Sequence, residues 1–535
     1  MSNKIIAKSA GIISIATLCS RILGFIRDII IARLFGVYTY AQAFVIAFRI
    51  PNLLRDLVGE GAVNSALVPV FSEYSLKKDK LEFWELANVV LNLSLVVLST
   101  LTILGIIFAP FIVKAIAPGF ISDPEKLATT IKLTRIIFPY ILLVSLAAYS
   151  MGILNALRHF SVPAFAPCLL NISLIICVLV FGEGIAGLAS GVLLGGLLQL
   201  AVQIPVLYRK GFRPKLFKKL APLEIGLEQR GLAKFLTGFK HPAAKTIGRL
   251  MVPRLLSSSI YQLNNFVDSI FGSFNWIIGE GGVAVLYFSY RLIQFPLGIF
   301  SNALSQAILP ALSIQALEET HAKLKHTLSW GLRTNFLVML PAGAGLMALS
   351  FPIIATLFGG RKFDAYSVQA TSSALFFYSI GLFAYGGTKI IQSGFVALKD
   401  TRTPAKIAGL ALAFNVIFNF LLMYPLKIAG LALATSISGI ATFLILLSIL
   451  KKRLGDFGSE PIFGPFLRIF LASLAMGLVT FFVSQKIFLG ATTLDKLFNL
   501  SFSIMLGIIS YVIFCFVFKV EEIKELWKWA RERYV

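Results

Sequence analysis

Apolar stretches long enough to cross a lipid bilayer recur along almost the whole chain. A spanning helix needs roughly 20 such residues. In lipid, an α-helix satisfies the hydrogen-bonding needs of its backbone N–H and C=O groups within itself. The sequence therefore predicts an all-α polytopic integral membrane protein. We expect 14 spans, near residues 14–36, 40–60, 86–113, 133–155, 162–181, 185–207, 250–275, 283–304, 329–350, 370–395, 405–424, 428–450, 464–485 and 497–518.

The net charge of +24 has two explanations, nucleic-acid binding and membrane topology. If the N-terminus is cytoplasmic, most Lys and Arg fall in cytoplasmic loops and tails, as the positive-inside rule requires. We therefore predict cytoplasmic termini and no nucleic-acid partner. The longest basic segment, 209–249, is expected to be a solvated topogenic loop. The alternative is a site for anionic lipid headgroups or a partner protein.

The two halves of the chain share an internal repeat. Ala66, Pro69 and Ser72 recur 241 residues later as Ala307, Pro310 and Ser313, and the pentapeptide IAGLA at 185 recurs at 428. Because six spans, an even number, separate equivalent positions, the halves are parallel repeats. Folds of this kind place substrate between their halves near the membrane midplane.

The repeat predicts a domain organisation. We expect two six-helix lobes around a central cationic cavity, followed by two further C-terminal helices. The predicted boundaries are 1–208 for the first lobe, 209–249 for the basic cytoplasmic loop, 250–450 for the second lobe, and 451–535 for the last two spans with a cytoplasmic tail.

Charged residues inside the first two spans form a repeated pattern. Arg, five residues and Arg-Asp occur as Arg21, Arg27 and Asp28, then as Arg49, Arg55 and Asp56. A charge at the bilayer centre costs about 3 kcal/mol, so such residues normally face a watery interior and serve function. Arg21 and Asp28 are seven residues apart and share a helix face, whereas Arg27 is expected to point elsewhere.

Cations exceed carboxylates in this predicted cavity. Arg291 in the eighth span belongs to the opposite wall, and Arg254, Lys389 and Glu60 are additional candidates. Excess buried positive charge is costly without an anion, and the planar arginine fork suits phosphate oxygens. We therefore predict a phosphate or pyrophosphate headgroup as substrate. The alternative is that Arg27 pairs with Asp28 or Asp56 and locks helices together.

A second polar group lies in the second half. Asp268, Asn415, Asn419 and Thr435 offer hard oxygen ligands for a coupling cation such as Na⁺. The alternative is a satisfied polar cluster that joins helices. We predict no other cofactor.

Catalysis has little support in this sequence. The four histidines fall in predicted cytoplasmic loops, the four cysteines sit singly in apolar spans, and no Asp-rich motif for Mg²⁺ is present. We predict that the protein is not an enzyme.

Several long motifs resemble those of the MurJ (MviN) lipid II flippase family, within the multidrug/oligosaccharidyl-lipid/polysaccharide exporter superfamily. The motifs are SRILGFIRD at 20, PNLLRDLVGEGAVNSALVPVFSEY at 51, FPYILLVSL at 138, FSVPAFAPCLLNIS at 160, RLIQFP at 291 and ILPALS at 308. The resemblance implies 14 helices in two lobes plus two C-terminal helices. The sequence departs from the family pattern at Gln42, Tyr290 and Gln294, where many relatives carry acidic residues.

The resemblance also implies a function. The substrate would be lipid II, the undecaprenyl-pyrophosphate-linked peptidoglycan precursor, flipped by alternating access from the inner to the outer leaflet of the bacterial cytoplasmic membrane. Membrane lipids and the cell-wall synthesis machinery would be further partners. The implied substrate-binding residues are Arg21, Arg27, Asp28, Arg49, Arg55 and Arg291. Two alternatives stay open, namely a multidrug or other lipid-linked oligosaccharide exporter, and a non-transporting scaffold of the cell envelope.

Overall fold

A computed structural model describes residues 3–55, 66–215, 242–243, 245–249, 251, 266–318, 320–455, 462–487 and 492–523. Within these ranges the chain is helical, and its one β-bridge is an isolated pair between Gly360 and Phe363. The fold divides into two compact units, Met1–Phe266 and Val267–Val535, and each is described by itself.

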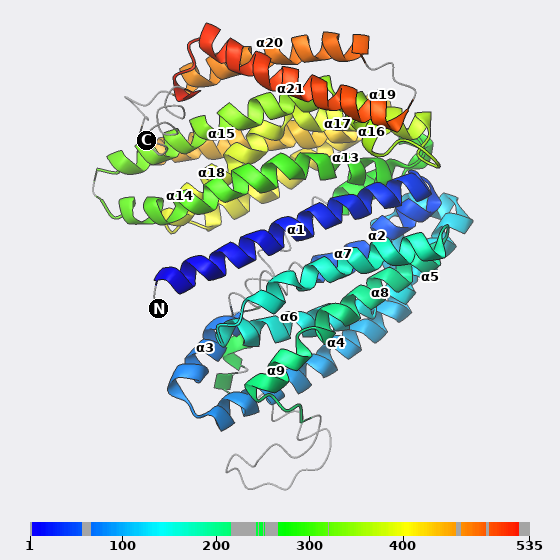
Figure 1. Cartoon of the computed structure of the whole chain (residues 1–535), viewed down its shortest axis with the longest axis vertical. Coiled ribbons are helices and arrows are strands. Elements are labelled where there is room, and N and C mark those ends of the chain that lie inside the picture. The colour runs from blue at the N-terminus through cyan, green and yellow to red at the C-terminus, as the bar shows by residue number, and fades with distance from the viewer. Residues whose placement is uncertain are drawn as a thin grey trace. The chain divides into compact units, whose positions relative to one another are not determined.

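Unit 1 contains a set of long helices joined by short turns (Figure 1). α1 packs along α7, α7 along α8, and α2 along α5. The elements are α1 (Asn3–Phe35), α2 (Thr39–Arg55), α3 (Val68–Lys77), α4 (Lys80–Ile116), the 3₁₀ turn η2 (Pro118–Ser122), α5 (Pro124–Ile137), α6 (Tyr140–Ala156), α7 (Ser161–Phe181), α8 (Ile185–Ala201) and α9 (Ile204–Lys210).

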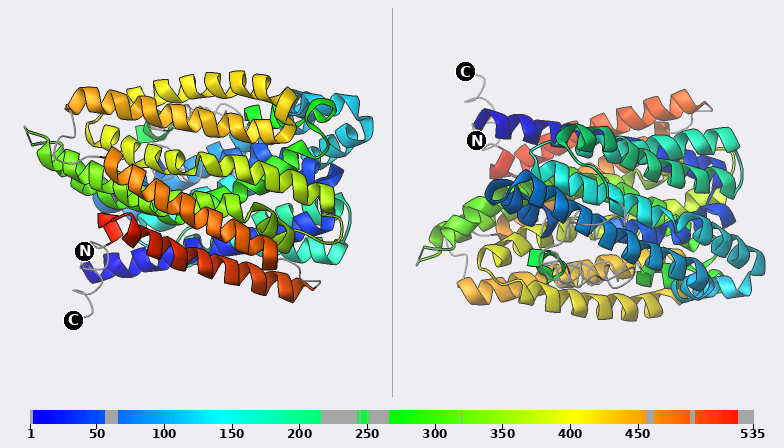
Figure 2. Two further views of the ribbon diagram at one scale, coloured as in Figure 1. Left: turned by 90° about the horizontal axis from the view of Figure 1, so that it is seen from above. Right: turned by 90° about the horizontal axis from the view of Figure 1, so that it is seen from below.

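Unit 2 is also built from helices that pack side by side. Its longest element, α19, is a hairpin whose two arms meet at Lys427, which has non-helical φ 52° and ψ −131° (Figure 2). The elements are α12 (Asn275–Ile278), α13 (Gly282–Pro296), the π-helical turn η3 (Leu297–Ser301), α14 (Asn302–Gln315), α15 (Ala322–Ala348), α16 (Ser350–Leu357), α17 (Ala365–Ile380), α18 (Leu382–Ala397), α19 (Arg402–Leu454), α20 (Phe463–Ile487) and α21 (Thr493–Val517).

Many of these helices are long and apolar enough to cross a membrane. The described residues contain eight such helices, or up to ten if each of two bent helix pairs is one span. Every predicted span except the first, second and seventh overlaps one of them. α1 carries six charged residues, α2 has only 17 residues, and most of 250–275 lies outside the described residues. The chain is therefore an all-helical polytopic membrane protein, and the count of 14 stays a prediction.

The two units turn the chain in the same way at positions 241 residues apart. α6 ends at Ala156 and α18 at Ala397, and each is followed by a residue in the left-handed region, Arg158 with φ 61° and Lys399 with φ 58°. The next residue then donates its backbone N–H to a carbonyl five residues back, at 2.8 Å for His159 and 2.9 Å for Asp400.

Helix starts repeat at the same offset. Asp123 caps α5 by accepting the N–H of Lys126, and Asp364 caps α17 by accepting the N–H of Ser367. These capping bonds satisfy backbone donors that a helix start otherwise leaves unpaired. Local turn chemistry therefore follows the repeat that the sequence predicts.

The described ends of the basic segment 209–249 keep their Lys and Arg side chains exposed, while three apolar side chains pack against unit 1. Phe212, Ala243 and Ile247 are buried in the hydrophobic core of unit 1. Asn88 of α4 donates to the carbonyl of Arg213 and accepts the N–H of Lys215 at 2.6 Å. Side chains of unit 1 thus fix the path of the segment where it leaves α9.

The last two helices, α20 and α21, belong to unit 2. α20 packs along α15 and α21 packs along α20. The hydroxyl of Tyr511 donates to the carbonyl of Leu337 at 2.8 Å, and Arg333 lies 3.6 Å from the largely buried Glu522. Polar contacts thus fasten the end of α21 to α15.

Candidate functional site

The candidate site is built on α1, which continues as a helix past Gly24. Its Arg27 and Asp28 are buried, with 4% and 1% of their side chains exposed. Burial of two charges in an apolar helix is costly unless the charges are paired and hydrogen-bonded. Both conditions are met here.

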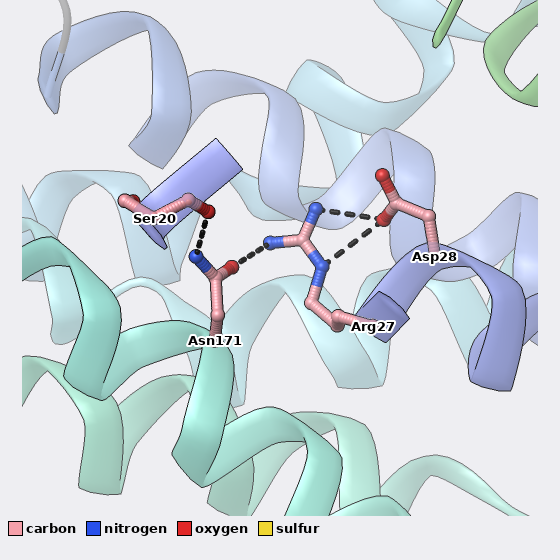
Figure 3. A network of polar contacts seen from close by, with 4 residues as sticks. All are labelled: Ser20, Arg27, Asp28 and Asn171. Carbon is pink, nitrogen blue, oxygen red and sulfur yellow. Dashed lines mark hydrogen bonds and ion pairs between the residues drawn. The ribbon is translucent and has the colours of Figure 1, made fainter. Parts of the chain in front are cut away.

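Asp28 holds one edge of the Arg27 guanidinium (Figure 3). Its Oδ1 accepts Nη2 at 2.7 Å and Nε at 3.0 Å. Arg27 thus pairs with Asp28, as in the alternative that the sequence left open, and the expectation that Arg27 points elsewhere is wrong. Adjacent helix residues leave the backbone in different directions, but the long arginine side chain turns back to its neighbour.

Asn171 of α7 holds another part of the same guanidinium. Its Oδ1 accepts Nη1 of Arg27 at 3.0 Å, and its Nδ2 donates to the carbonyl of Ser20 on α1 at 3.1 Å (Figure 3). A Cβ built on Gly24 would lie 3.6 Å from the Asn171 amide. This is an ordinary van der Waals distance, so the Asn171 amide packs directly against this turn of α1.

The remaining cations of the predicted cavity in unit 1 lie on α1 and α2. Arg21 is exposed, one to two turns before Arg27. Arg49 and Arg55 are half-buried on α2 and engage in contacts there. Asp56 and Glu60 lie outside the described residues.

In unit 2, Arg291 and Lys389 lie on two helices that both pack against the π-helical turn η3. Both side chains are half-buried and engaged in contacts. The Arg291 guanidinium stacks over the Tyr287 ring at 5.4 Å. Arg254 lies outside the described residues.

Three of the four residues of the predicted cation site are joined by hydrogen bonds. The Asn415 amide nitrogen donates to the Thr435 hydroxyl at 3.1 Å across the two arms of α19. The Asn419 amide nitrogen donates to Oδ1 of the Asn415 side chain at 2.9 Å. The buried Oδ1 atom of Asn419 has no hydrogen-bond partner among the residues that the structure describes. Asp268 is half-buried on the helical segment 266–272 of the same unit. The bonds among the three residues fit a helix-joining cluster, and the remaining amide oxygen is suited to a cation.

Sequence reasoning missed Asn171 and the carbonyl of Ser20. The available signal was an amide side chain within an otherwise apolar span, because such groups usually bond across helices. Among the described residues, no group of three or more His, Cys, Asp or Glu is arranged to hold a metal ion.

Comparisons with known proteins agree over most of the chain. The sequence model of the family described as "Lipid II flippase MurJ" matches residues 31–512. The chain is 34% identical to the probable lipid II flippase MurJ of Buchnera aphidicola subsp. Acyrthosiphon pisum, over 94% of this chain and 95% of that protein. It is also 34% identical to the lipid II flippase MurJ of Burkholderia cenocepacia, over 82% of each.

Solved structures show the same fold. A lipid II flippase MurJ in an inward closed conformation matches with a TM-score of 0.76 and 29% identity, over 96% of this chain and 99% of that one. An inward-facing multidrug resistance MATE family transporter of the MOP superfamily matches with a TM-score of 0.63 and 18% identity, over 82% and 95%. The second likeness concerns fold alone. The chain belongs to the MurJ family of lipid II flippases, which are membrane transporters rather than enzymes.

Proposed function

We propose that this protein flips lipid II from the inner to the outer leaflet of the bacterial cytoplasmic membrane by alternating access. Family membership supports the substrate and the membrane. The observation that carries the mechanism is the buried Arg27, held inside an apolar helix by one carboxylate and one amide. A membrane helix retains such a cation where it serves function.

The architecture we propose has fourteen spans, in two parallel six-helix lobes around a central cationic cavity, with α20 and α21 appended. The corners after α6 and α18, which match at an offset of 241 residues, support the two-lobe repeat. The termini would both be cytoplasmic, as the distribution of Lys and Arg requires.

The arginines would bind the pyrophosphate of the headgroup. Arg21, Arg49, Arg55 and Arg291 carry positive charge that the Arg27–Asp28 pair does not cancel. An arginine fork donates two parallel hydrogen bonds to phosphoryl oxygens. Asp28 would keep Arg27 neutralised while the site is empty, and the pyrophosphate would then compete for the guanidinium.

The polyprenyl tail would stay in lipid while the headgroup crosses. Extracting an acyl or prenyl chain costs about 0.8 kcal/mol per CH₂, so a carrier gains by moving the headgroup alone. Exposed apolar side chains on α20 and α21, including Phe470, Phe482 and Phe516, offer a surface along which the tail could lie.

We also propose that Na⁺ binds in unit 2 and couples its gradient to transport. The ligands would be Asp268, Asn415, Asn419 and Thr435. The buried Asn419 oxygen without a hydrogen-bond partner supports this site, because amide and carboxylate oxygens suit hard cations.

Complementation of a flippase-depleted bacterium tests the function. Wild-type protein should restore growth, whereas Arg27→Ala and Arg55→Ala at equal membrane levels should fail. Arg402→Ala is the matched control, since Arg402 is exposed and its contact with Asp400 uses the backbone N–H. Failure of membrane-inserted wild type to rescue would contradict lipid II as substrate. Rescue by both cavity variants would contradict the arginine mechanism and favour a scaffold.

A further inference from the structure

We propose that Asn171 is a positioning residue for Arg27: it holds the guanidinium in a defined orientation until the anionic headgroup takes its place. The proposal rests on the role of Arg27 in the proposed function. It assigns a role in headgroup capture to α7, a helix that carries none of the predicted cavity arginines.

The two bonds of Asn171 fix which way its amide faces. The carbonyl oxygen accepts from Arg27 at 3.0 Å, and the amide nitrogen donates to the Ser20 carbonyl at 3.1 Å. Turning the amide over would set its NH₂ against the guanidinium and its oxygen against a carbonyl. Because both partners lie on α1, Asn171 is held as a rigid acceptor, and only 6% of the residue is exposed.

A neutral acceptor suits a cation that must be released. Asp28 already supplies the negative charge, because its carboxylate accepts hydrogen bonds from Nε and Nη2 of Arg27. The Asp28 carboxylate adds the attraction of its charge to two hydrogen bonds, whereas the neutral Asn171 amide accepts a single one. A pyrophosphate oxygen can therefore displace the Asn171 amide from Nη1 more readily than it can displace the Asp28 carboxylate.

The same contacts couple the guanidinium to the packing of two helices. α1 and α7 pack along each other, and Gly24 lies on the turn of α1 that faces the Asn171 amide. Cys168, one turn before Asn171, approaches the Ala16 carbonyl of α1 at 3.8 Å. Cys168 thus offers a control in the same interface, because its hydrogen bond goes to Ala16 and not to Arg27.

A double-mutant cycle tests the proposal, because residues that act through one another have effects that do not add. The full-length protein is reconstituted in vesicles, and lipid II transport is measured for wild type, Asn171→Leu, Arg27→Lys and the double variant. We expect Asn171→Leu to raise the half-saturating lipid II concentration about 5-fold and to have no further effect in the Arg27→Lys background. Lysine keeps the charge of arginine but lacks its fork.

Cys168→Ala alters packing alone. Its effect on the half-saturating lipid II concentration should therefore be the same fold-change in wild type and in the Arg27→Lys background. If Asn171→Leu does not accumulate in the membrane, Asn171→Ala takes its place in the cycle. Arg27→Lys should itself impair transport. If Asn171→Leu then causes the same fold-change in the Arg27→Lys background as in wild type, Asn171 is only a packing residue and the inference is overturned. If Arg27→Lys transports like wild type, the role of Arg27 in the proposed function fails, and the positioning role fails with it.

Discussion

The equivalent helices of the two units, α7 and the first arm of α19, both carry buried asparagines but give them different partners. α7 begins at residue 161 and α19 at residue 402, at the repeat offset of 241. Asn171 of α7 accepts from a guanidinium that is paired with a carboxylate. Asn415 and Asn419 of α19 bond to each other and to the hydroxyl of Thr435.

The first helix of unit 1 and the helical segment 266–272 extend this difference. Asp268 stands 241 residues after Arg27, so that a carboxylate in unit 2 occupies the repeat position of a cation in unit 1. At this repeat position the two units thus carry residues of opposite charge. The difference suggests that unit 1 is built to receive an anion and unit 2 to receive a cation, in line with the roles proposed for them.

The largest effect should come from breaking the charged cluster. Asp28→Asn leaves Arg27 buried without its carboxylate, and losing one partner of a buried pair costs about 3–5 kcal/mol. Asn415→Leu loses only neutral hydrogen bonds, worth about 1 kcal/mol each. Thermal unfolding in detergent should therefore show a much lower melting temperature for Asp28→Asn. Equal losses would remove the distinction between the two clusters.

The corner of unit 2 should lose stability in acid. The Thr403 hydroxyl and N–H, together with Arg453, lower the pKa of Asp400 from 3.8 to about 2. Since the folded pKa lies below the ordinary value, this contribution to stability is present above pH 4 and lost as the pH falls towards 2.

Asp400→Asn should flatten the dependence of unfolding on pH between 4 and 2. The residue of unit 1 at the repeat position of Asp400 is His159, which has no carboxylate. His159→Gln should therefore leave the dependence of unfolding on pH between 4 and 2 as in wild type. An acid dependence unchanged by Asp400→Asn would show that the corner does not carry it.

Sodium should stabilise the protein through unit 2. A cation at ten times its dissociation constant adds about 1.4 kcal/mol, so NaCl should raise the melting temperature above that in choline chloride at equal ionic strength. Asp268→Asn and Asn419→Leu should abolish the difference, and Asn171→Leu should keep it. Identical melting in both salts would argue against the cation site.

The smallest effect should distinguish the two equivalent helix caps. Asp364→Ala loses a cap worth about 1 kcal/mol. Asp123→Ala loses the same kind of cap and also an ion pair at 3.2 Å with Lys126, whose side chain is 3% exposed. Denaturant unfolding should therefore rank Asp123→Ala below Asp364→Ala in stability. The reverse order would show that the Lys126 pair adds nothing.

Local patterns in the sequence predicted the helices and the repeat. Apolar runs marked most spans, and the IAGLA pentapeptide at 428 marked the second arm of α19, which begins just after Lys427. These features depend on neighbours in the chain. The structure adds that turns also match at the offset of 241 residues, which the repeated motifs alone did not predict.

Contacts distant in the chain could not be read in the same way. Asn171 meets Arg27 across 144 residues, and Asn88 fixes Arg213 and Lys215 across 125 and 127. The sequence left the pairing of Arg27 with Asp28 open as an alternative, because the partner that a long side chain reaches depends on the buried environment around it. Tertiary packing decided each of these outcomes, and no periodicity encodes it.

The most direct test of the account is transport of lipid II by the purified protein in vesicles, with Arg27→Ala beside Arg402→Ala at equal protein content. The account predicts at least a tenfold lower transport rate for Arg27→Ala and an unchanged rate for Arg402→Ala. Wild-type transport that survives intact in Arg27→Ala would contradict the claim that the buried arginine of α1 receives the headgroup.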